Sequence, residues 1–371
     1  MKSLFSPAIA LMNRLGYNKK FALLWLMSLA AIVMLVYSLF VSLSQVIRTS
    51  QLELEGITLI KHTSQTIHVI QQLRWLSADL LGGDEAVQEL FSDKEEEAAK
   101  IFDTTERKLP ARLSGSGEWN NIKESWRRLR HDGFSWTVGD NIAAYTRLVK
   151  QVHSFEVIVA DQYRLTTESE LGKYYLIDTA INKLPDSLEH LGQLGTYGVE
   201  ILNKRQITET DKISLYGILA KLYASNNLLG ANLEKIGLDN PRLQSSLSAA
   251  FSEVFDAERQ IADIVRSGIL NGHLTTPPEE LYKSTSAVLD SGYLLLHGSL
   301  LPITEMLIKE RIAQSERTLY MNIGLALLLL LVVGYFSAGI YFSIIGSIQS
   351  LARSSRAFAG GDLRARVRLE T

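Results

Sequence analysis

The chain has 371 residues, of which 46% are hydrophobic, and its formal net charge is −2. It contains no cysteine, which excludes disulfide bonds, thiolate metal sites and cysteine catalysis. Basic residues gather at both ends of the chain, and the acidic middle argues against nucleic acid as a partner.

Two uncharged stretches stand out along the chain. The first, 21–47, follows a basic leader at 1–20, and the second covers 319–345. Each is longer than the roughly 20 residues that cross the apolar core of a bilayer. A signal peptide has a shorter apolar region, so we expect both stretches to be uncleaved transmembrane helices. A buried helical hairpin of a soluble protein is the alternative, and the length of both stretches disfavours it.

The charges beside these stretches predict the topology. Basic residues precede the first stretch and arginines follow the second, so both termini are expected in the cytoplasm. Residues 48–318 would then lie outside, which in a bacterium is the periplasm. The predicted location is the bacterial inner (cell) membrane, in a multi-pass topology with lipid as a neighbour.

The outer segment begins with a helix that we expect to end near Leu81. Its apolar residues recur with a 3.6-residue period, and Gly82-Gly83-Asp84 then breaks it, with Asp84 as a cap for the next helix. A helix over 85–108 follows. Loops are predicted at 109–119 and 131–140, with a short helix between them.

The rest of the outer segment is also predicted to be helical. A long helix should run from Asn141 towards Asn182, and Thr208 should cap a helix that ends near Gly237. Asn240-Pro241 reads as a cap followed by proline at the first helical position. Thr276-Pro277-Pro278-Glu279 has the spacing of a capping box, and the last outer helix should run from there into the second stretch without a break.

The predicted fold class is therefore all-α. No alternating strand pattern is found, and the outer segment is long for one four-helix bundle. We expect an elongated, bimodular helical bundle in which two modules are stacked, flanked by the two transmembrane helices.

The segment 346–371 continues the second stretch as an amphipathic helix that glycine stops, followed by a basic run. Gly361, Leu363 and Val367 match the glycine and the two apolar anchors of a HAMP connector, so the segment resembles the first helix and connector of a truncated HAMP domain. The resemblance implies that these three residues relay a signal. Ser347 departs from the proline usual there, and the second HAMP helix is missing. An ordinary juxtamembrane basic helix is the alternative.

Several phrases, in this order along the chain, resemble bacterial chemoreceptors of the methyl-accepting type with long helical sensor regions. They are SPAIALMNRLGYNKKFALL (6–24), ELEGITLI (53–60), RWLSADLLGGD (74–84) and YYLIDTAINKLPDSLEHLGQL (174–194). The arginine-then-LSA phrase is also similar to nitrate- and nitrite-sensing domains. The resemblance implies a dimer that detects small molecules outside and controls a cytoplasmic output.

Arg74 is the candidate ligand-binding residue, because an arginine fork can hold a planar anion through paired hydrogen bonds. The resemblance places an anion-binding arginine at this phrase, but Gly195 stands where a second arginine is expected. A helix-face arginine paired with an acid such as Asp79 is the favoured alternative. The aromatic residues Trp119, Trp126, Phe134 and Trp136, like Tyr174 and Tyr175, are interpreted as core and loop anchors rather than as a pocket.

Catalysis is not expected. The histidines are scattered, so no metal site and no cofactor are predicted, and no catalytic motif is recognised. Residues 82–85 share four letters with the diguanylate cyclase signature, but Ala86 replaces its phenylalanine, so a helix break explains them better.

We therefore expect a transmembrane receptor, most like a chemotaxis receptor, that senses an extracytoplasmic small molecule or a periplasmic binding protein and acts as a homodimer. Cytoplasmic signalling partners are expected only if an output domain follows. The input module of a sensor histidine kinase or of a diguanylate cyclase is the first alternative. A membrane-anchored scaffold without a ligand is the second.

Overall fold

The computed structural model describes residues 6–168 and 170–360. These residues form helices and no strand, so the predicted all-α class is confirmed for the described part of the chain. The chain divides into two compact units, one made of residues 1–48 with 311–371 and the other of residues 49–310.

The first unit contains α1 (Ser6–Asn13), the beginning of α2 (Tyr17–Leu81) and most of α12 (Leu301–Ala359). Both predicted apolar stretches are helical, since 21–47 lies within α2 and 319–345 within α12. Within the described residues, two helices are thus long and apolar enough to cross a membrane, and none of the most apolar window of either is buried. Water-exposed apolar surface of this extent is costly, so these helices need an apolar environment.

The second unit contains the later part of α2, from residue 49, and the helices that follow it. These are α3 (Gln88–Lys108), α4 (Ala111–Ser114), α5 (Gly117–Asp132), α6 (Val138–Gln162), α7 (Leu171–Asp178), α8 (Leu184–Lys204), α9 (Glu209–Asp239), α10 (Pro241–Asp263) and α11 (Pro278–Leu295). Short 3-10 turns are found at Glu85–Val87, Gly133–Ser135, Leu165–Thr167 and Ile269–Asn271. Wider π-helical turns are found at Thr179–Lys183, Ile264–Gly268 and Leu296–Leu300.

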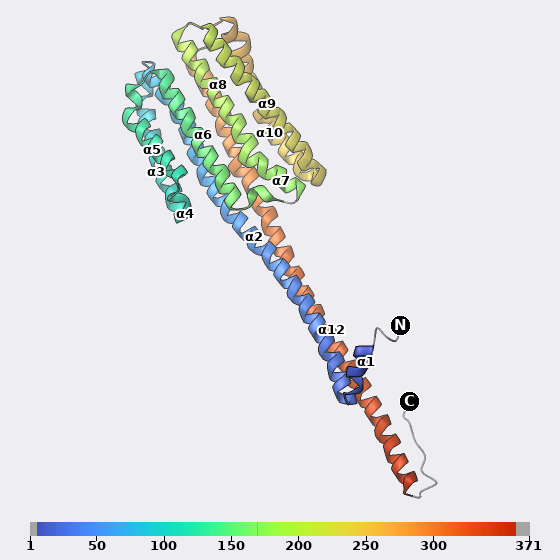
Figure 1. The fold of residues 1–371 in the computed structure, drawn as a ribbon. Helices are drawn as coiled ribbons and strands as arrows, with labels where there is room; N and C mark the ends of the chain where they lie inside the picture. The colour runs from blue at the N-terminus through green and yellow to red at the C-terminus, as the bar shows by residue number, and fades with distance from the viewer. Residues whose placement is uncertain (1–5, 169, 361–371) are drawn as a thin grey trace. The chain divides into compact units, whose positions relative to one another are not determined.

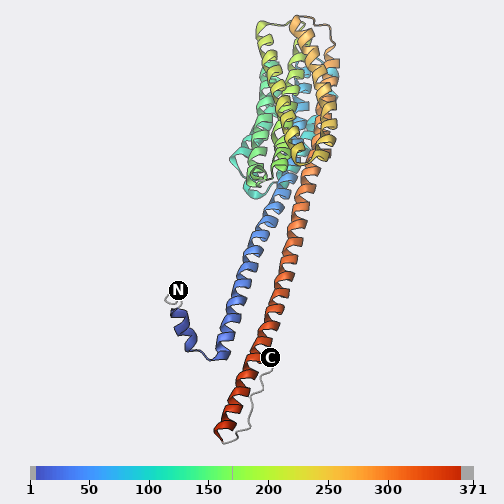
Figure 2. The same ribbon diagram turned by 90° about the vertical axis from the view of Figure 1, so that its right-hand side faces the viewer.

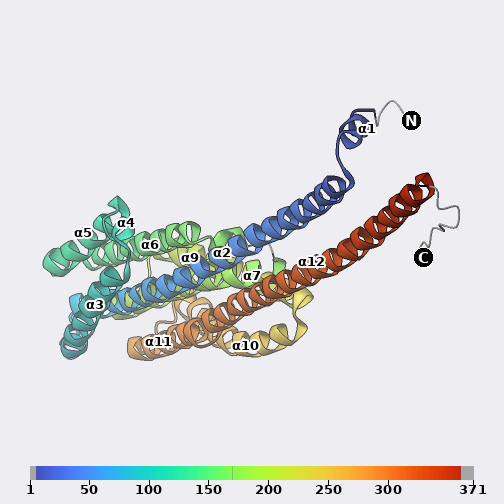
Figure 3. The same ribbon diagram turned by 90° about the horizontal axis from the view of Figure 1, so that it is seen from below.

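The helices of this unit form two groups that lie side by side (Figures 1 and 3). One group contains α2, α3, α5 and α6, and the other contains α8, α9, α10 and α11. All run along a common direction (Figure 2), so the expected stacking of two modules end to end is wrong. The α2 residues Gln71 and Arg74 bond to α8, and Gln71 also bonds to α11, so α2 joins the two groups.

Three of the predicted N-terminal helix caps are confirmed, and in each a side-chain oxygen accepts a hydrogen bond from a backbone amide. Thr208 and Asp211 form a capping box at α9, and Asn240 accepts a hydrogen bond from the Leu243 amide at 3.1 Å. Asp84 accepts from the Ala86 amide at 3.0 Å. The expected capping box at Thr276 is wrong, because α11 begins after Pro277 without a side-chain cap.

Two expected helix boundaries are also wrong. The helix predicted to run from Asn141 towards Asn182 ends at Gln162, and Arg164 then adopts a left-handed conformation with a φ of 64°. The loop predicted at 109–119 contains the short helix α4. The apolar stripe of α2 is confirmed, since Ile60, Ile70 and Leu73 are fully buried.

Replacing Gly56 with alanine should destabilise the second unit. A Cβ at Gly56 would lie 2.5 Å from the Cβ of Tyr163, an atom that moves only with its backbone. Overpacking of this kind costs about 1–3 kcal/mol. Chemical denaturation of the full chain in detergent, followed by circular dichroism, measures the loss.

Gly217→Ala is the matched control, because nothing lies within 4 Å of a Cβ added at that position of α9. There alanine should stabilise the helix by about 0.5–1 kcal/mol. Equal effects at the two positions would contradict the close approach of α2 to Tyr163.

Candidate functional site

Arg74 is fully buried on α2 and does not lie on an exposed helix face. Its Nη1 donates to Glu189 Oε1 on α8 at 2.6 Å and to Thr146 Oγ1 on α6 at 3.2 Å. The acid expected as its partner, Asp79, instead accepts from Asn203 Nδ2 at 3.0 Å. The expected Arg74–Asp79 pair is therefore wrong.

The ion pair of Arg74 extends into a chain of hydrogen bonds. Gln71 Nε2 donates to Glu189 Oε2 at 2.8 Å, and the Tyr293 hydroxyl donates to Gln71 Oε1 at 3.0 Å. Burial raises the pKa of the Tyr293 hydroxyl well above its usual value, which keeps it a donor. We call Gln71, Arg74, Thr146, Glu189 and Tyr293 the Arg74 polar layer, which links α2, α6, α8 and α11.

Arg74 keeps buried N–H groups for which the described residues offer no acceptor. Its Nε and Nη2 have no hydrogen-bond partner, and such unpaired donors are costly. Beside it, a Cβ at Gly192 would lie 2.8 Å from Nη2. The adjoining cavity, lined in part by Gln71 and Gly192, has a volume of about 20 Å³, room for about one water. An anion would therefore need the helices to part, and anion binding by Arg74 stays a prediction.

The site of the missing second arginine is closed. A Cβ at Gly195 would lie 2.5 Å from Thr285 Cγ2, so no larger side chain fits there without a shift of α11. Position 195 therefore adds no second arginine to this layer. The positive charge of Arg74 is balanced by the Glu189 carboxylate.

Two histidines lie next to the polar layer on the side of α11. His68 stacks on the ring of Tyr293, and its Nε2 lies 2.8 Å from Asp290 Oδ1. This hydrogen bond holds the pKa of Asp290 below its usual value. His297 lies in the π-helical turn at 296–300. Its ring nitrogens are buried without a partner, and burial lowers its pKa to about 4.

His68 and His297 share a cavity of about 600 Å³. Lys61, Lys94 and Glu97 also line it. The described residues hold no group of three or more histidines and carboxylates that would bind a metal. The cavity was not predicted, because π-helical turns leave no clear mark in a hydrophobic pattern.

Two buried carboxyl groups lie in the core. Burial raises the pKa of Glu156 to about 8, and Thr63 Oγ1 donates to its Oε2 at 2.7 Å. Burial raises the pKa of Glu258 to about 7, against hydrogen bonds from Asn226 and Ser187 that lower it. Burial thus favours the neutral form of both carboxyl groups.

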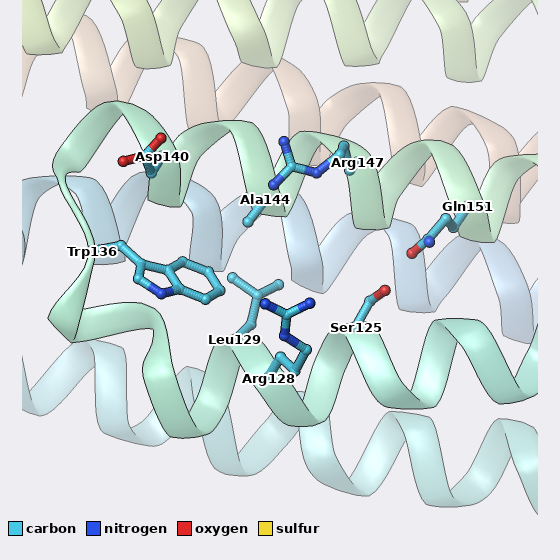
Figure 4. Close-up of a pocket in the computed structure, with 8 residues that line it drawn as sticks. All are labelled: Ser125, Arg128, Leu129, Trp136, Asp140, Ala144, Arg147 and Gln151. Carbon is cyan, nitrogen blue, oxygen red and sulfur yellow. The ribbon is translucent and has the colours of Figure 1, made fainter.

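A further pocket lies between α5 and α6 (Figure 4). Arg128 and Arg147 face it, together with Trp136, and it has a volume of about 290 Å³. Of the predicted aromatic anchors, Trp119 and Trp126 are buried in the core, Phe134 is exposed, and Trp136 lines this pocket. The arginines follow no known motif, so sequence reasoning missed them.

The predicted relay residues Gly361, Leu363 and Val367 lie outside the described residues. The helix before them is described, since α12 continues through Ser347 to Ala359. Comparison of the chain with protein families, with curated proteins and with solved structures gives no match in any of the three. The resemblance to chemoreceptors and to HAMP domains therefore stays a prediction.

Proposed function

We propose that the protein is a transmembrane receptor whose outer unit binds a small molecule and passes the signal across a bacterial inner membrane. The observation that supports the proposal most is the Arg74 polar layer. Through Glu189 and Gln71 it connects α2 to α11. The first apolar stretch belongs to α2, and α11 leads through the turn at 296–300 into α12, which contains the second.

The polar layer is suited to two arrangements. Arg74 retains unpaired N–H groups, and Glu189 accepts from Arg74 and Gln71 on α2 as well as from Gln193 on its own helix, so a ligand that draws α6 or α8 away would change the bonds to α2. A shift of about 1–2 Å in one helix is typical of receptors. A coupling free energy of about 1–3 kcal/mol is enough to bias such an equilibrium.

The π-helical turn at 296–300 supplies a second adjustable element. Such turns occur often at functional sites, and this one lies between α11 and α12. We infer that the receptor acts as a homodimer and that residues 346–371 form a HAMP-like relay through Gly361, Leu363 and Val367. A chemotaxis output is the first choice, and a histidine kinase or cyclase output is the alternative.

Thiol labelling in intact cells tests the topology on which the proposal rests. The natural chain lacks cysteine, so single substitutions report without background. A membrane-impermeant maleimide that enters the periplasm should label Ser246→Cys, an exposed position of α10, and should not label Ser355→Cys, an exposed position of α12. Leu331→Cys, whose side chain is 73% exposed, should form a disulfide-linked dimer on oxidation.

Permeabilised cells are the control, because both labelling positions should then react. Equal labelling of Ser246→Cys and Ser355→Cys in intact cells would overturn the proposal. So would a Leu331→Cys protein that stays monomeric in bilayers while neighbouring positions of α12 also fail to crosslink.

A further inference from the structure

The pocket between α5 and α6 is lined by two arginines and one carboxylate. Arg128 on α5 and Arg147 on α6 point into it from facing helices (Figure 4). Neither forms an ion pair within 4.0 Å in the described part of the chain. Glu124, near Arg128, is already paired with Arg127 at 2.6 Å. Two guanidinium groups that face one pocket repel each other, and a bound anion would offset this.

The acid that lines this pocket is engaged elsewhere. Asp140 accepts a hydrogen bond from Thr137 Oγ1 at 2.7 Å, and its amide donates to the same hydroxyl at 3.1 Å. The Thr137 hydroxyl therefore caps the first turn of α6, and the Asp140 carboxylate bonds to this hydroxyl and to neither arginine. The pocket remains positively charged and open to an anionic group.

The ends of the pocket differ in polarity. Trp136 and Leu129 lie at one end, Ser125 and Gln151 at the other, with the two arginines between them (Figure 4). Trp136 is half-buried and offers a flat apolar face. The Gln151 Oε1 is buried without a hydrogen-bond partner, so it needs a donor.

We propose that this pocket binds a small aromatic 2-hydroxycarboxylate. The aromatic ring lies against Trp136 and Leu129, and the carboxylate accepts hydrogen bonds from Arg128 and Arg147. The hydroxyl beside the carboxylate donates to Gln151. A volume of about 290 Å³ accommodates a ligand with one ring, although it lies at the lower end of ligand pockets.

The pocket adjoins the Arg74 polar layer through α6. Arg147 follows Thr146, whose hydroxyl accepts from Arg74 Nη1 at 3.2 Å. A ligand that draws Arg147 towards α5 would therefore act on the bond between α6 and α2. This deepens the proposed function by naming a ligand class. The ligand proposal rests on the proposed receptor function only where it says that binding changes the signal. Binding itself requires no signal transfer.

Calorimetric titration of the full chain in lipid nanodiscs with mandelate tests the proposal. Saturable binding is expected, and Arg128→Gln and Arg147→Gln should each weaken it about tenfold or more, the loss of one charge-assisted hydrogen bond. Arg127→Gln is the matched control. Arg127 neighbours Arg128 on α5, pairs with Glu124 and does not line the pocket. The Arg127→Gln variant should therefore bind mandelate as tightly as the natural chain does.

Three relatives of mandelate separate the contacts. Lactate lacks the ring, benzyl alcohol lacks the carboxylate, and phenylacetate lacks the hydroxyl, so each should bind more weakly than mandelate. The proposal is overturned if mandelate does not bind, if any of the three binds as tightly, or if Arg127→Gln weakens binding as much as Arg128→Gln. Binding can fail while the thiol-labelling pattern stands, so the two proposals fail separately.

Discussion

Replacing Arg74 with methionine should lower the free energy of unfolding by about 3–5 kcal/mol. The substitution removes one partner of a buried ion pair and leaves the Glu189 carboxylate, whose side chain is 16% exposed, without its cation. The bonds from Gln71 and Gln193 remain, but neutral amides compensate less than a guanidinium. Denaturant unfolding of the full chain in detergent, followed by tryptophan fluorescence, measures the loss.

A double substitution shows whether the unpaired charge is the cause. Arg74→Met combined with Glu189→Gln should be less destabilised than the sum of the single variants, because the amide leaves no buried charge. Arg130→Met is the control, since Arg130 pairs with Glu95 at 3.3 Å on the surface and should cost less than about 1 kcal/mol. Equal losses at Arg74 and Arg130 would contradict the role given to the polar layer.

Glu156 should make the unfolding free energy fall as the pH rises. Its pKa is raised to about 8 in the folded chain from a usual value of 4.5. Between these values the folded carboxyl holds a proton that the unfolded one has lost. Its contribution is complete below the lower value and is lost as the pH rises through the higher one. The slope is roughly 1.4 kcal/mol per pH unit.

Glu156→Gln removes the ionisable group and keeps an acceptor for Thr63, which donates to Oε2 at 2.7 Å. The variant should therefore lack this slope and exceed the natural chain in stability at pH near 8, as read from unfolding curves at several pH values. Glu118→Gln, at an exposed position of α5, should leave the pH dependence unchanged. A Glu156→Gln protein that keeps the slope of the natural chain would show that Glu156 does not cause it.

The helices could be predicted because their signals are local. The buried stripe of α2, the cap at Asn240 and the capping box at Thr208 each depend on residues within a few positions of one another. The end of α6 was missed because apolar residues continue beyond Gln162. The chain turns there through Arg164, which adopts a left-handed conformation. Glycine is the usual sequence signal for this conformation, and it is missing at this position.

The contacts between segments that are distant in the sequence could not be predicted. Glu189 lies 115 positions from Arg74, and no periodicity or propensity joins them. Asp79, the nearer acid, was the natural choice and was wrong. The arginines at 128 and 147 sit on separate helices, and only the packing of α5 on α6 makes them face each other. Whether the two groups of helices stack or lie side by side is likewise decided by tertiary packing.

The π-helical turn at 296–300 has a consequence for length variation in the gene. Such a turn holds one residue more than an ordinary helical turn. A one-codon deletion inside it would leave an uninterrupted helix. The same deletion elsewhere in α12 would place every later side chain about 100° away around the axis. Single-residue gaps among orthologues should therefore fall at this turn.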